Sequence, residues 1–169
     1  MRFLIILLIC AACGSATPPP RSPDPTPIDP AQTTMGTQAF ATGRSLQTRG
    51  HFAQAEQAFR QALKESPSNP QYHYNLGVVL HAQSQFKEAQ THLKKALEIK
   101  PDYAGPQIAL GKMLYDVHGK VEEACEFLNS AITLAPQATE ARSILGKIYQ
   151  REGRLEEAST IFTAILAEG

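Results

Sequence analysis

The chain has 169 residues, 43% of them hydrophobic, and its 16 basic and 16 acidic residues give a formal net charge of zero. A balanced chain lacks the strong positive field on which nucleic-acid binding depends, so we expect no nucleic-acid partner. The length and the apolar fraction are sufficient for a folded domain with a continuous core.

The chain begins with a short apolar segment that predicts export. Arg2 precedes an uninterrupted apolar run over residues 3–12. This run is shorter than the roughly 20 residues that cross a bilayer, but it has the size of a signal-peptide core. Cys10-Ala11-Ala12-Cys13 resembles the cleavage box of bacterial lipoproteins, in which small residues precede a lipidated cysteine. The resemblance implies a signal peptide over 1–12 and acylation of Cys13, with palmitate among the acyl chains.

Two points about export stay open at this stage. Gly14 and Ala16 are also small, so ordinary signal cleavage after Ala16 is the alternative to lipidation. Gly14 stands directly after Cys13, where an aspartate marks inner-membrane retention in some bacterial lipoproteins. By that resemblance we expect a lipid anchor at the periplasmic face of the outer membrane rather than the inner membrane.

A proline-rich segment follows the cysteine. Seven of the twelve prolines lie between residues 18 and 30, mixed with Ser, Thr and Asp. Such a composition buries too little apolar surface to fold and favours extended conformations. We therefore predict a disordered linker over 13–35, with the lipid on its first residue, that could extend to about 60 Å at roughly 3.1 Å per residue.

The rest of the chain repeats with a period in the thirties. The units are 36–69, 70–103, 104–138 and 139–169. A fixed period of this length predicts a stack of identical structural units. The clearest copy is the second, and its landmarks recur in the same order in the others: Leu76, Gly77, Leu80, Phe86, Ala89, Leu93, Ala96 and Pro101.

Each unit has the pattern of two amphipathic helices. Small residues such as Gly77 and Ala89 predict a close approach of the two helices of a pair. Prolines at 67, 101 and 136 predict the ends of the second helices in the first three units, because proline removes a hydrogen-bond donor and clashes with the preceding turn. Gly50, Ser84, Gly119 and Gly153 predict the break between the helices. The fold class that follows is all-α: a right-handed α-solenoid of four stacked helix-turn-helix units.

This pattern resembles the tetratricopeptide repeat family over residues 36–169. One departure is the family's frequent aromatic near the start of the first helix, which is replaced by Ala39, His73, Gln107 or Arg142. Another is one additional residue around His118 in the third unit, which we expect to lengthen the turn there. The resemblance implies a concave groove, lined by the first helices, that binds a peptide or a protein.

The resemblance also assigns candidate groove residues. The Lys/Asn/Arg set with which one subtype of the family holds a chaperone's C-terminal carboxylate is represented only by Asn75, which argues against a cochaperone role. A mixed surface of aromatic, aliphatic and cationic residues suits an extended peptide or a partner helix. The candidate residues are Phe40, Arg44, Gln47, Gln71, Tyr74, Val78, His81, Ile108, Lys112, Tyr115, Glu140, Ser143, Lys147 and Gln150.

We find no pattern that indicates catalysis or metal binding. The five histidines lack the helical spacing of metal ligands, and no nucleophile motif or phosphate-binding glycine loop is present. Glu122-Glu123 and Glu156-Glu157 each open a second helix, where negative charge complements the helix dipole. Cys125 is expected to be a small packed residue. We therefore expect no enzyme activity, no catalytic residue, no cofactor and no metal.

The last unit carries more apolar surface than its own partner helix can cover. Repeat arrays normally end in a polar outer face. This end is therefore predicted to contact another protein, a second copy or the bilayer surface. The residues concerned are Leu155, Ile161, Phe162, Ile165 and Leu166.

The sequence thus favours a non-catalytic interaction module, anchored by lipid in the periplasm, that acts as an adaptor or assembly factor for an envelope complex. Its architecture is similar to that of the pilotin-like lipoproteins of type IV pilus systems, which assist secretin assembly. The alternatives are a scaffold subunit of cell-wall or outer-membrane protein assembly machinery, a soluble secreted binding module, and an enzyme subunit.

Overall fold

The computed structural model describes the backbone of residues 30–167 and the side chains of residues 35–167. The predicted signal peptide, Cys13 and most of the predicted linker lie outside these residues. No helix in the described part of the chain is both long and apolar enough to cross a membrane. The described residues form eight helices: α1 Pro30–Thr48, α2 Phe52–Glu65, α3 Pro70–Ala82, α4 Phe86–Ile99, α5 Ala104–His118, α6 Val121–Leu134, α7 Thr139–Arg151 and α8 Leu155–Ala167.

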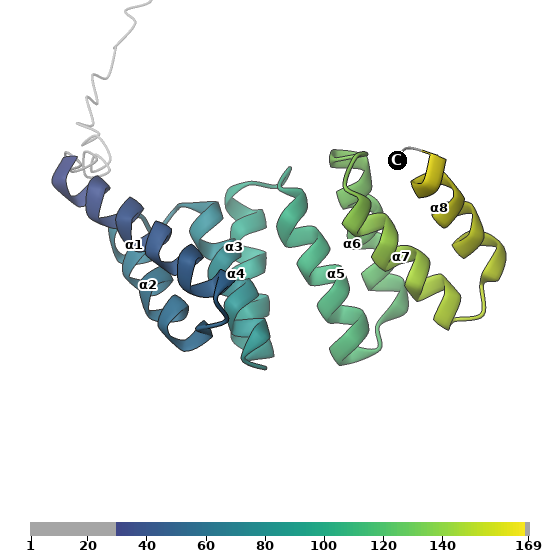
Figure 1. The fold of residues 1–169 in the computed structure, drawn as a ribbon, viewed down its shortest axis with the longest axis horizontal. Coiled ribbons are helices and arrows are strands. Elements are labelled where there is room, and N and C mark those ends of the chain that lie inside the picture. Colours follow the sequence, from purple (N-terminus) through teal and green to yellow (C-terminus); the bar gives the residue numbers. More distant parts are fainter. Residues whose placement is uncertain (1–29, 168–169) are drawn as a thin grey trace, which may run out of the picture.

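The helices pack as consecutive hairpins. α1 packs on α2, α3 on α4, α5 on α6 and α7 on α8, and each pair contacts the next through α2·α3, α4·α5 and α6·α7. Figure 1 shows the result as an elongated row, with α1 and α2 at one end and α8 at the other. The predicted all-α stack of four helix pairs is confirmed.

The predicted end of the disordered linker, at residue 35, is wrong. Residues 30–35 are helical, because α1 begins at Pro30 and not after residue 35. Proline is well tolerated at the first position of a helix, since its missing N–H would have no partner there and its φ is already helical. The first helix pair therefore begins before the predicted unit 36–69.

The two helices of each pair approach closely at one glycine of the first helix. A Cβ on Gly77 of α3 would lie 2.8 Å from Cγ of Leu93 on α4. This distance is shorter than a carbon–carbon contact allows, so only glycine lets the two helices approach this closely. The same arrangement recurs in every pair, between Gly43 and Phe59, Gly111 and Leu128, and Gly146 and Phe162.

The first helix of three pairs ends in the same motif. After α3, Ser84 takes a φ of +62°, and the backbone N–H groups of Ser84 and Gln85 donate to the carbonyls of His81 and Leu80, each at 2.9 Å. These two bonds form a Schellman motif, which satisfies carbonyls at the helix end. Gly50 and Gly153 occupy the equivalent position after α1 and α7, with φ of +77° and +75°.

The hydrogen-bonded turn at the end of α5, in the third pair, is one residue wider. The N–H of Lys120 donates to Leu114 at 3.0 Å, and that of Gly119 donates to Tyr115 at 3.1 Å. Each bond spans one residue more than its counterpart after α3. The additional residue of the third unit is therefore accommodated inside the last turn of α5, rather than in a longer connection to α6.

Side chains near the start of the first helices connect one pair to the next. The His73 ring Nε2 lies 2.9 Å from the carbonyl oxygen of Pro67, and Gln107 Nε2 donates to that of Pro101 at 3.2 Å. Both prolines follow the end of the preceding second helix, as predicted. His73 and Gln107 replace the aromatic residue that is frequent in the family, and here the position carries a hydrogen bond between repeats.

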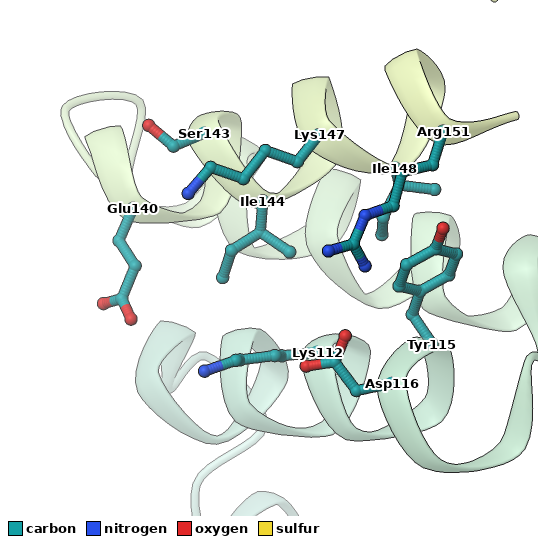
Figure 2. Close-up of a pocket in the computed structure, with 9 residues that line it drawn as sticks. All are labelled: Lys112, Tyr115, Asp116, Glu140, Ser143, Ile144, Lys147, Ile148 and Arg151. Atoms are coloured by element: carbon teal, nitrogen blue, oxygen red, sulfur yellow. The ribbon is translucent and has the colours of Figure 1, made fainter. Parts of the chain in front are cut away.

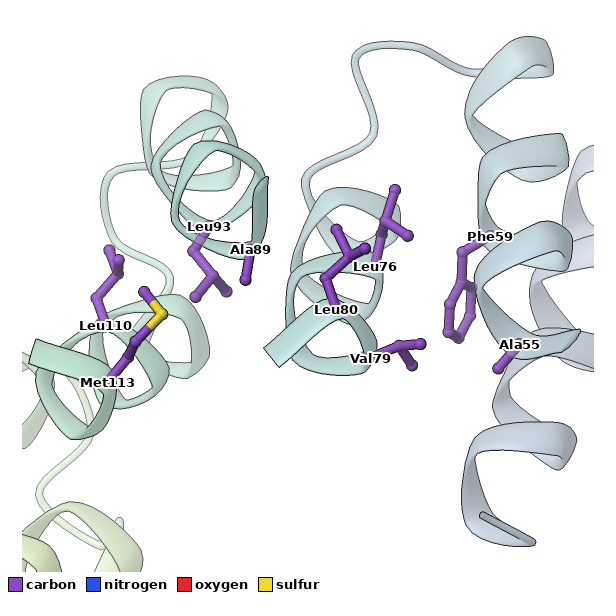
Figure 3. Packing of buried hydrophobic residues seen from close by; sticks show 9 residues of the cluster. All are labelled: Ala55, Phe59, Leu76, Val79, Leu80, Ala89, Leu93, Leu110 and Met113. Atoms are coloured by element: carbon purple, nitrogen blue, oxygen red, sulfur yellow. The ribbon is translucent and has the colours of Figure 1, made fainter. Parts of the chain in front are cut away.

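The core is continuous across the pairs. Figure 3 shows Phe59 of α2 beside Leu76 and Val79 of α3, and Leu93 of α4 beside Met113 of α5. A second cluster joins α5, α6 and α7. Because each second helix packs on the first helix of the following pair, the first helices line up along one face, and this face holds the candidate site.

Candidate functional site

Three hollows lie in a row along the first helices. The first lies between α1 and α3, the second between α3 and α5, and the third between α5 and α7. Tyr74 lines both the first and the second, while Lys112 and Glu140 line both the second and the third. Since neighbouring hollows share residues, they form one continuous channel, which we call the groove.

The first hollow presents phenol and amide groups. The rings of Tyr74 and Tyr103 lie 5.3 Å apart, and Lys100 Nζ lies 5.8 Å from the centre of the Tyr103 ring. Burial is the main cause that raises the pKa of Tyr74, with smaller effects from Tyr103 and Glu140. Burial likewise raises the pKa of Tyr103. Both phenols therefore stay protonated at neutral pH and can donate a hydrogen bond.

The second hollow contains an aliphatic patch. Val78 and Ile108 line it together with His81. Burial lowers the pKa of the His81 imidazole, and the positive charge of Lys112 lowers it further. The imidazole is therefore neutral at neutral pH, and it lies beside aliphatic side chains in a hollow that Tyr74, Lys112 and Glu140 also line.

The third hollow is the most highly charged. Figure 2 shows Lys112, Tyr115 and Asp116 of α5 facing Glu140, Lys147 and Arg151 of α7 across it. The Arg151 guanidinium lies 5.8 Å from the centre of the Tyr115 ring, within the range of a cation–π contact. Ile144 and Ile148 also line it.

Cations outnumber acids in the groove. Arg44, Lys112, Lys147 and Arg151 line it, against Asp116 and Glu140. Within the part of the chain that the structure describes, none of these four cations forms an ion pair. Their charge is therefore available to a ligand. Arg60 on α2 differs, because its guanidinium forms ion pairs with Glu56 at 2.9 Å and Glu88 at 2.6 Å.

Most of the predicted groove residues lie in the groove, but two do not. The prediction that Phe40 lines the groove is wrong, because its ring stacks on Tyr72 at 4.6 Å and contacts Phe59 at 5.6 Å. An aromatic side chain of α1 gains more by packing on α2 and α3 than by facing water. Gln150 is exposed but lines none of the three hollows. The other predicted residues line the groove: Arg44, Gln47, Gln71, Tyr74, Val78, His81, Ile108, Lys112, Tyr115, Glu140, Ser143 and Lys147.

The structure adds groove residues that the sequence reasoning missed. Asp116 and Arg151 lie one helical turn after Lys112 and Lys147, so continuing the same stripe by four residues would have found them. Tyr103 follows α4 in the connection to α5, and no helical periodicity points to it.

No group of three or more metal-ligating side chains occurs among residues 35–167. The free thiol of Cys125 is partly buried, and burial is the main cause that raises its pKa. A thiol that stays protonated is a poor nucleophile, in agreement with a packing role.

Comparisons with known proteins place the repeats in a large family. Two family models described as tetratricopeptide repeat match residues 40–104 and 118–169, together more than half of the chain. The protein O-mannosyl-transferase Tmtc3 of Drosophila melanogaster is 30% identical over 105 residues, which are 62% of this chain and 11% of Tmtc3. The BBSome complex member BBS4 of Mus musculus is 32% identical over 107 residues, which are 63% of this chain and 20% of BBS4. The chain thus spans only about a tenth to a fifth of the length of these relatives.

Solved structures show the same architecture. Pseudomonas aeruginosa PilF superposes with a TM-score of 0.73 and 26% identity, over 81% of this chain and 62% of PilF. MamA gives 0.69 and 21%, over 78% of this chain and 77% of MamA. The first repeat domain of RPAP3, solved with an HSP90 peptide, gives 0.66 and 20%, over 72% of this chain and 95% of that domain. The last two are similar in fold alone.

Proposed function

Because the chain belongs to the tetratricopeptide repeat family, we propose that it is a non-catalytic adaptor that binds a segment of another protein in its groove. As a domain built from these repeats, it is a protein–protein interaction module. We further propose that a lipid on Cys13 holds it at the periplasmic face of the bacterial outer membrane, where it assists the assembly of an envelope complex.

The observation that carries the binding role is the groove itself. It runs without interruption through three neighbouring hollows, and the aliphatic side chains of Val78 and Ile108 lie between Arg44 at one end and Lys147 and Arg151 at the other. An apolar side chain of the ligand can be buried against Val78 and Ile108, while acidic groups on either side meet Arg44 and the cluster around Lys147. The ligand that fits best is an extended peptide or a helix with an apolar anchor and acidic flanks.

The envelope role is supported by the start of the sequence and by one structural relative. A short apolar run followed by Cys10-Ala11-Ala12-Cys13 resembles a lipoprotein signal. PilF of Pseudomonas aeruginosa superposes over 81% of this chain, with 26% sequence identity. A pilus or secretin system is therefore our first choice of envelope complex, and a scaffold in cell-wall or outer-membrane protein assembly is the second.

Enzymatic relatives do not favour a catalytic role. Tmtc3 and the O-GlcNAc transferase of Thermobaculum terrenum are named as transferases, but this chain covers 11% of the first and 22% of the second. The similarity to Tmtc3 extends over 105 residues of this chain. The similarity to the O-GlcNAc transferase, at 24% identity, concerns the fold alone.

Site-specific crosslinking tests the groove. A photoreactive residue at position 112 or 147 should capture the same partner from cells, and one at Lys94, exposed on α4 of the second-helix face, should not. Reversing the charge with Lys112→Glu plus Lys147→Glu should lower the crosslinking yield from position 143 at least tenfold. The matched variant Lys94→Glu plus Lys95→Glu should leave it unchanged. Equal capture from position 94, or a yield insensitive to the groove charges, would contradict the proposal.

A further inference from the structure

The first hollow differs from the other two in the rings and charges that line it. Phe52, Tyr74 and Tyr103 supply three aromatic rings, and no acidic side chain of the described residues lines it. The second hollow shares only Tyr74 of these rings, the third has a single phenol, and each of the two is lined by at least one carboxylate. The first hollow is therefore suited to a ligand that packs apolar groups against aromatic rings.

The two phenol rings of this hollow rest against the backbone of Gly105. A Cβ at this position would lie 3.1 Å from Cζ of Tyr74 and 3.3 Å from Cε2 of Tyr103. Both distances are shorter than an ordinary carbon–carbon contact, so a larger residue would displace the rings, which lie 5.3 Å apart. The absence of a side chain at Gly105 thus lets both rings line the same hollow.

The polar groups of the first hollow offer hydrogen-bond donors. The side-chain amides of Gln47 and Gln71 make no hydrogen bond to another described residue, and the phenols of Tyr74 and Tyr103 are protonated. A complementary ligand supplies carbonyl oxygens and apolar rings. A proline-rich strand does so, because proline has no N–H and the polyproline conformation leaves every carbonyl without an internal partner. Strands of this kind dock in grooves lined by aromatic residues.

The chain itself contains such a segment, close to the hollow. Residues 17–23 read Thr-Pro-Pro-Pro-Arg-Ser-Pro, and they precede α1, whose last turns line the first hollow. Arg44 lies about 21 Å along α1 from Pro30 at 1.5 Å per residue. An extended strand that runs back from Pro30 would cover this distance in about seven residues at 3.1 Å each. Pro23 and the residues before it can therefore reach Arg44, whereas Pro25 and Pro27 cannot.

The side of α1 that leads to the hollow carries small side chains. Thr37, Ala41, Arg44 and Thr48 follow one another at alternating steps of four and three residues, so they lie on one side of the helix. All four are exposed, and the two that precede Arg44 are no larger than threonine. A strand that follows this side of α1 from Pro30 therefore meets no bulky side chain before the hollow.

We propose that residues 17–23 dock in the first hollow of the same molecule, with prolines 18–20 against the aromatic rings and their carbonyls at the amide donors. Because the segment is tethered, its effective concentration at the hollow is in the millimolar range, so even a millimolar affinity fills the hollow about half of the time. The docked segment occupies one end of the groove. A partner must displace it there, but not from the second and third hollows. This competition rests on the proposed groove function, whereas the docking does not.

Photocrosslinking within the full-length chain tests the docking. A benzophenone residue in place of Gln47, which lines the first hollow, should join to residues 17–23 of the same molecule, with a yield independent of protein concentration. The same residue in place of Ser143, which lines the third hollow, should give at least ten times less of this product. Peptide mapping by mass spectrometry identifies the joined residues. No product with residues 17–23, equal yield from position 143, or a yield that rises with concentration would overturn the docking within one molecule.

Proline variants test what the hollow binds. Replacing Pro18, Pro19 and Pro20 together by serine should lower the yield from position 47 at least fivefold. The matched variant Pro25→Ser plus Pro27→Ser should change it less than twofold, because these prolines lie too close to α1 to reach the hollow. Tyr103→Leu should also lower the yield, and circular dichroism verifies that the helices are retained. A yield that survives either loss, or that falls equally in both proline variants, would overturn the proposal. The measurement needs no partner, so its failure leaves the adaptor role unaffected.

Discussion

Ser84 occupies a backbone conformation that three of the four inter-helix turns leave to glycine. Its φ of +62° lies in the left-handed region, like those of Gly50, Gly119 and Gly153. This region costs an L-residue roughly 1–2 kcal/mol, while glycine enters it freely. The position was identifiable from the repeat alignment, but the sequence alone does not show that serine is strained there.

We predict that Ser84→Gly raises the free energy of unfolding by about 1 kcal/mol, because relief of the strain exceeds the entropy that glycine adds to the unfolded chain. Urea denaturation measures the change. Gly50→Ser is the reverse control, and it should lower stability by a similar amount: nothing lies within 4 Å of a Cβ at Gly50, so the change reports conformation alone. A shift of the same sign in both variants would contradict this account.

The buried His73 and the partly buried His92 share a proton-sensitive contact. His73 Nδ1 and His92 Nδ1 are 2.9 Å apart, and His73 Nε2 faces the Pro67 carbonyl at 2.9 Å. Since a carbonyl only accepts, His73 Nε2–H is the donor, and its Nδ1 is left to accept from His92 Nδ1–H. Burial is the first cause that lowers the pKa of His92, followed by His73; Glu88 acts against it and Arg60 with it.

A lowered folded-state pKa means that the unfolded chain binds more protons in acid. We therefore expect full stability above the unfolded histidine pKa of about 6.5 and a loss as the pH falls below it. His81, whose pKa is also lowered, contributes in the same window. Unfolding free energies measured at several pH values from 7.5 to 5.5 should show this slope. His92→Gln should reduce it, and an unchanged slope in both His92→Gln and His81→Gln would contradict the assignment.

At the scale of the helix pair, the glycine contact decides how closely two helices pack. Gly77 lies against Leu93, which is 1% exposed, and a Cβ there would also lie 3.2 Å from the Ala89 carbonyl oxygen. Alanine is normally better than glycine inside a helix by about 1 kcal/mol. Here the steric cost is larger, because the backbone of α4 cannot move away as a flexible side chain could.

Gly77→Ala should therefore lower the free energy of unfolding by about 1–3 kcal/mol, the usual cost of overpacking a core. Thermal and urea denaturation of the single and double variants give the test. A Leu93→Ala background removes the 2.8 Å contact and leaves the Ala89 carbonyl oxygen at 3.2 Å, so adding Gly77→Ala should cost less there than it does in the wild type. Strict additivity of the two changes would show that the contact does not limit packing.

At the scale of the whole molecule, the groove and the proposed lipid anchor are parts of one proposal, because a tethered adaptor presents its groove at the membrane. Replacing Cys13 by alanine should release the protein from membranes or leave it unprocessed. The wild-type protein should have a mature mass that starts at Cys13 and includes acyl chains. Intact-mass spectrometry of the membrane and soluble fractions distinguishes these forms. A mature protein that starts at Thr17 without lipid would make it a soluble secreted module, and an unprocessed cytosolic product would remove the envelope role.

The repeat pattern in the sequence was sufficient to predict the stack of four helix pairs. Gly77 against Leu93 and Pro101 at the end of α4 act through local sterics, which depend on residue type and spacing alone. For that reason the helix pairs, their close contacts and their ends could be predicted from the sequence. The first turn of α1 could not, because a proline-rich composition hides the fact that proline suits the start of a helix.

What the sequence by itself determined is the order and pairing of the helices, since those depend on residues near one another in the chain. What only the tertiary structure decided is which side chains stay exposed on the assembled faces. Phe40 turns into the core because Tyr72, in the next pair, offers it a ring to stack on, and Tyr103 joins the groove from a connection. Leu166 is 80% exposed because the helix that would cover it is absent from the described stack. Exposure depends on neighbours that are distant in sequence, and the positions of those neighbours are set only when the pairs stack.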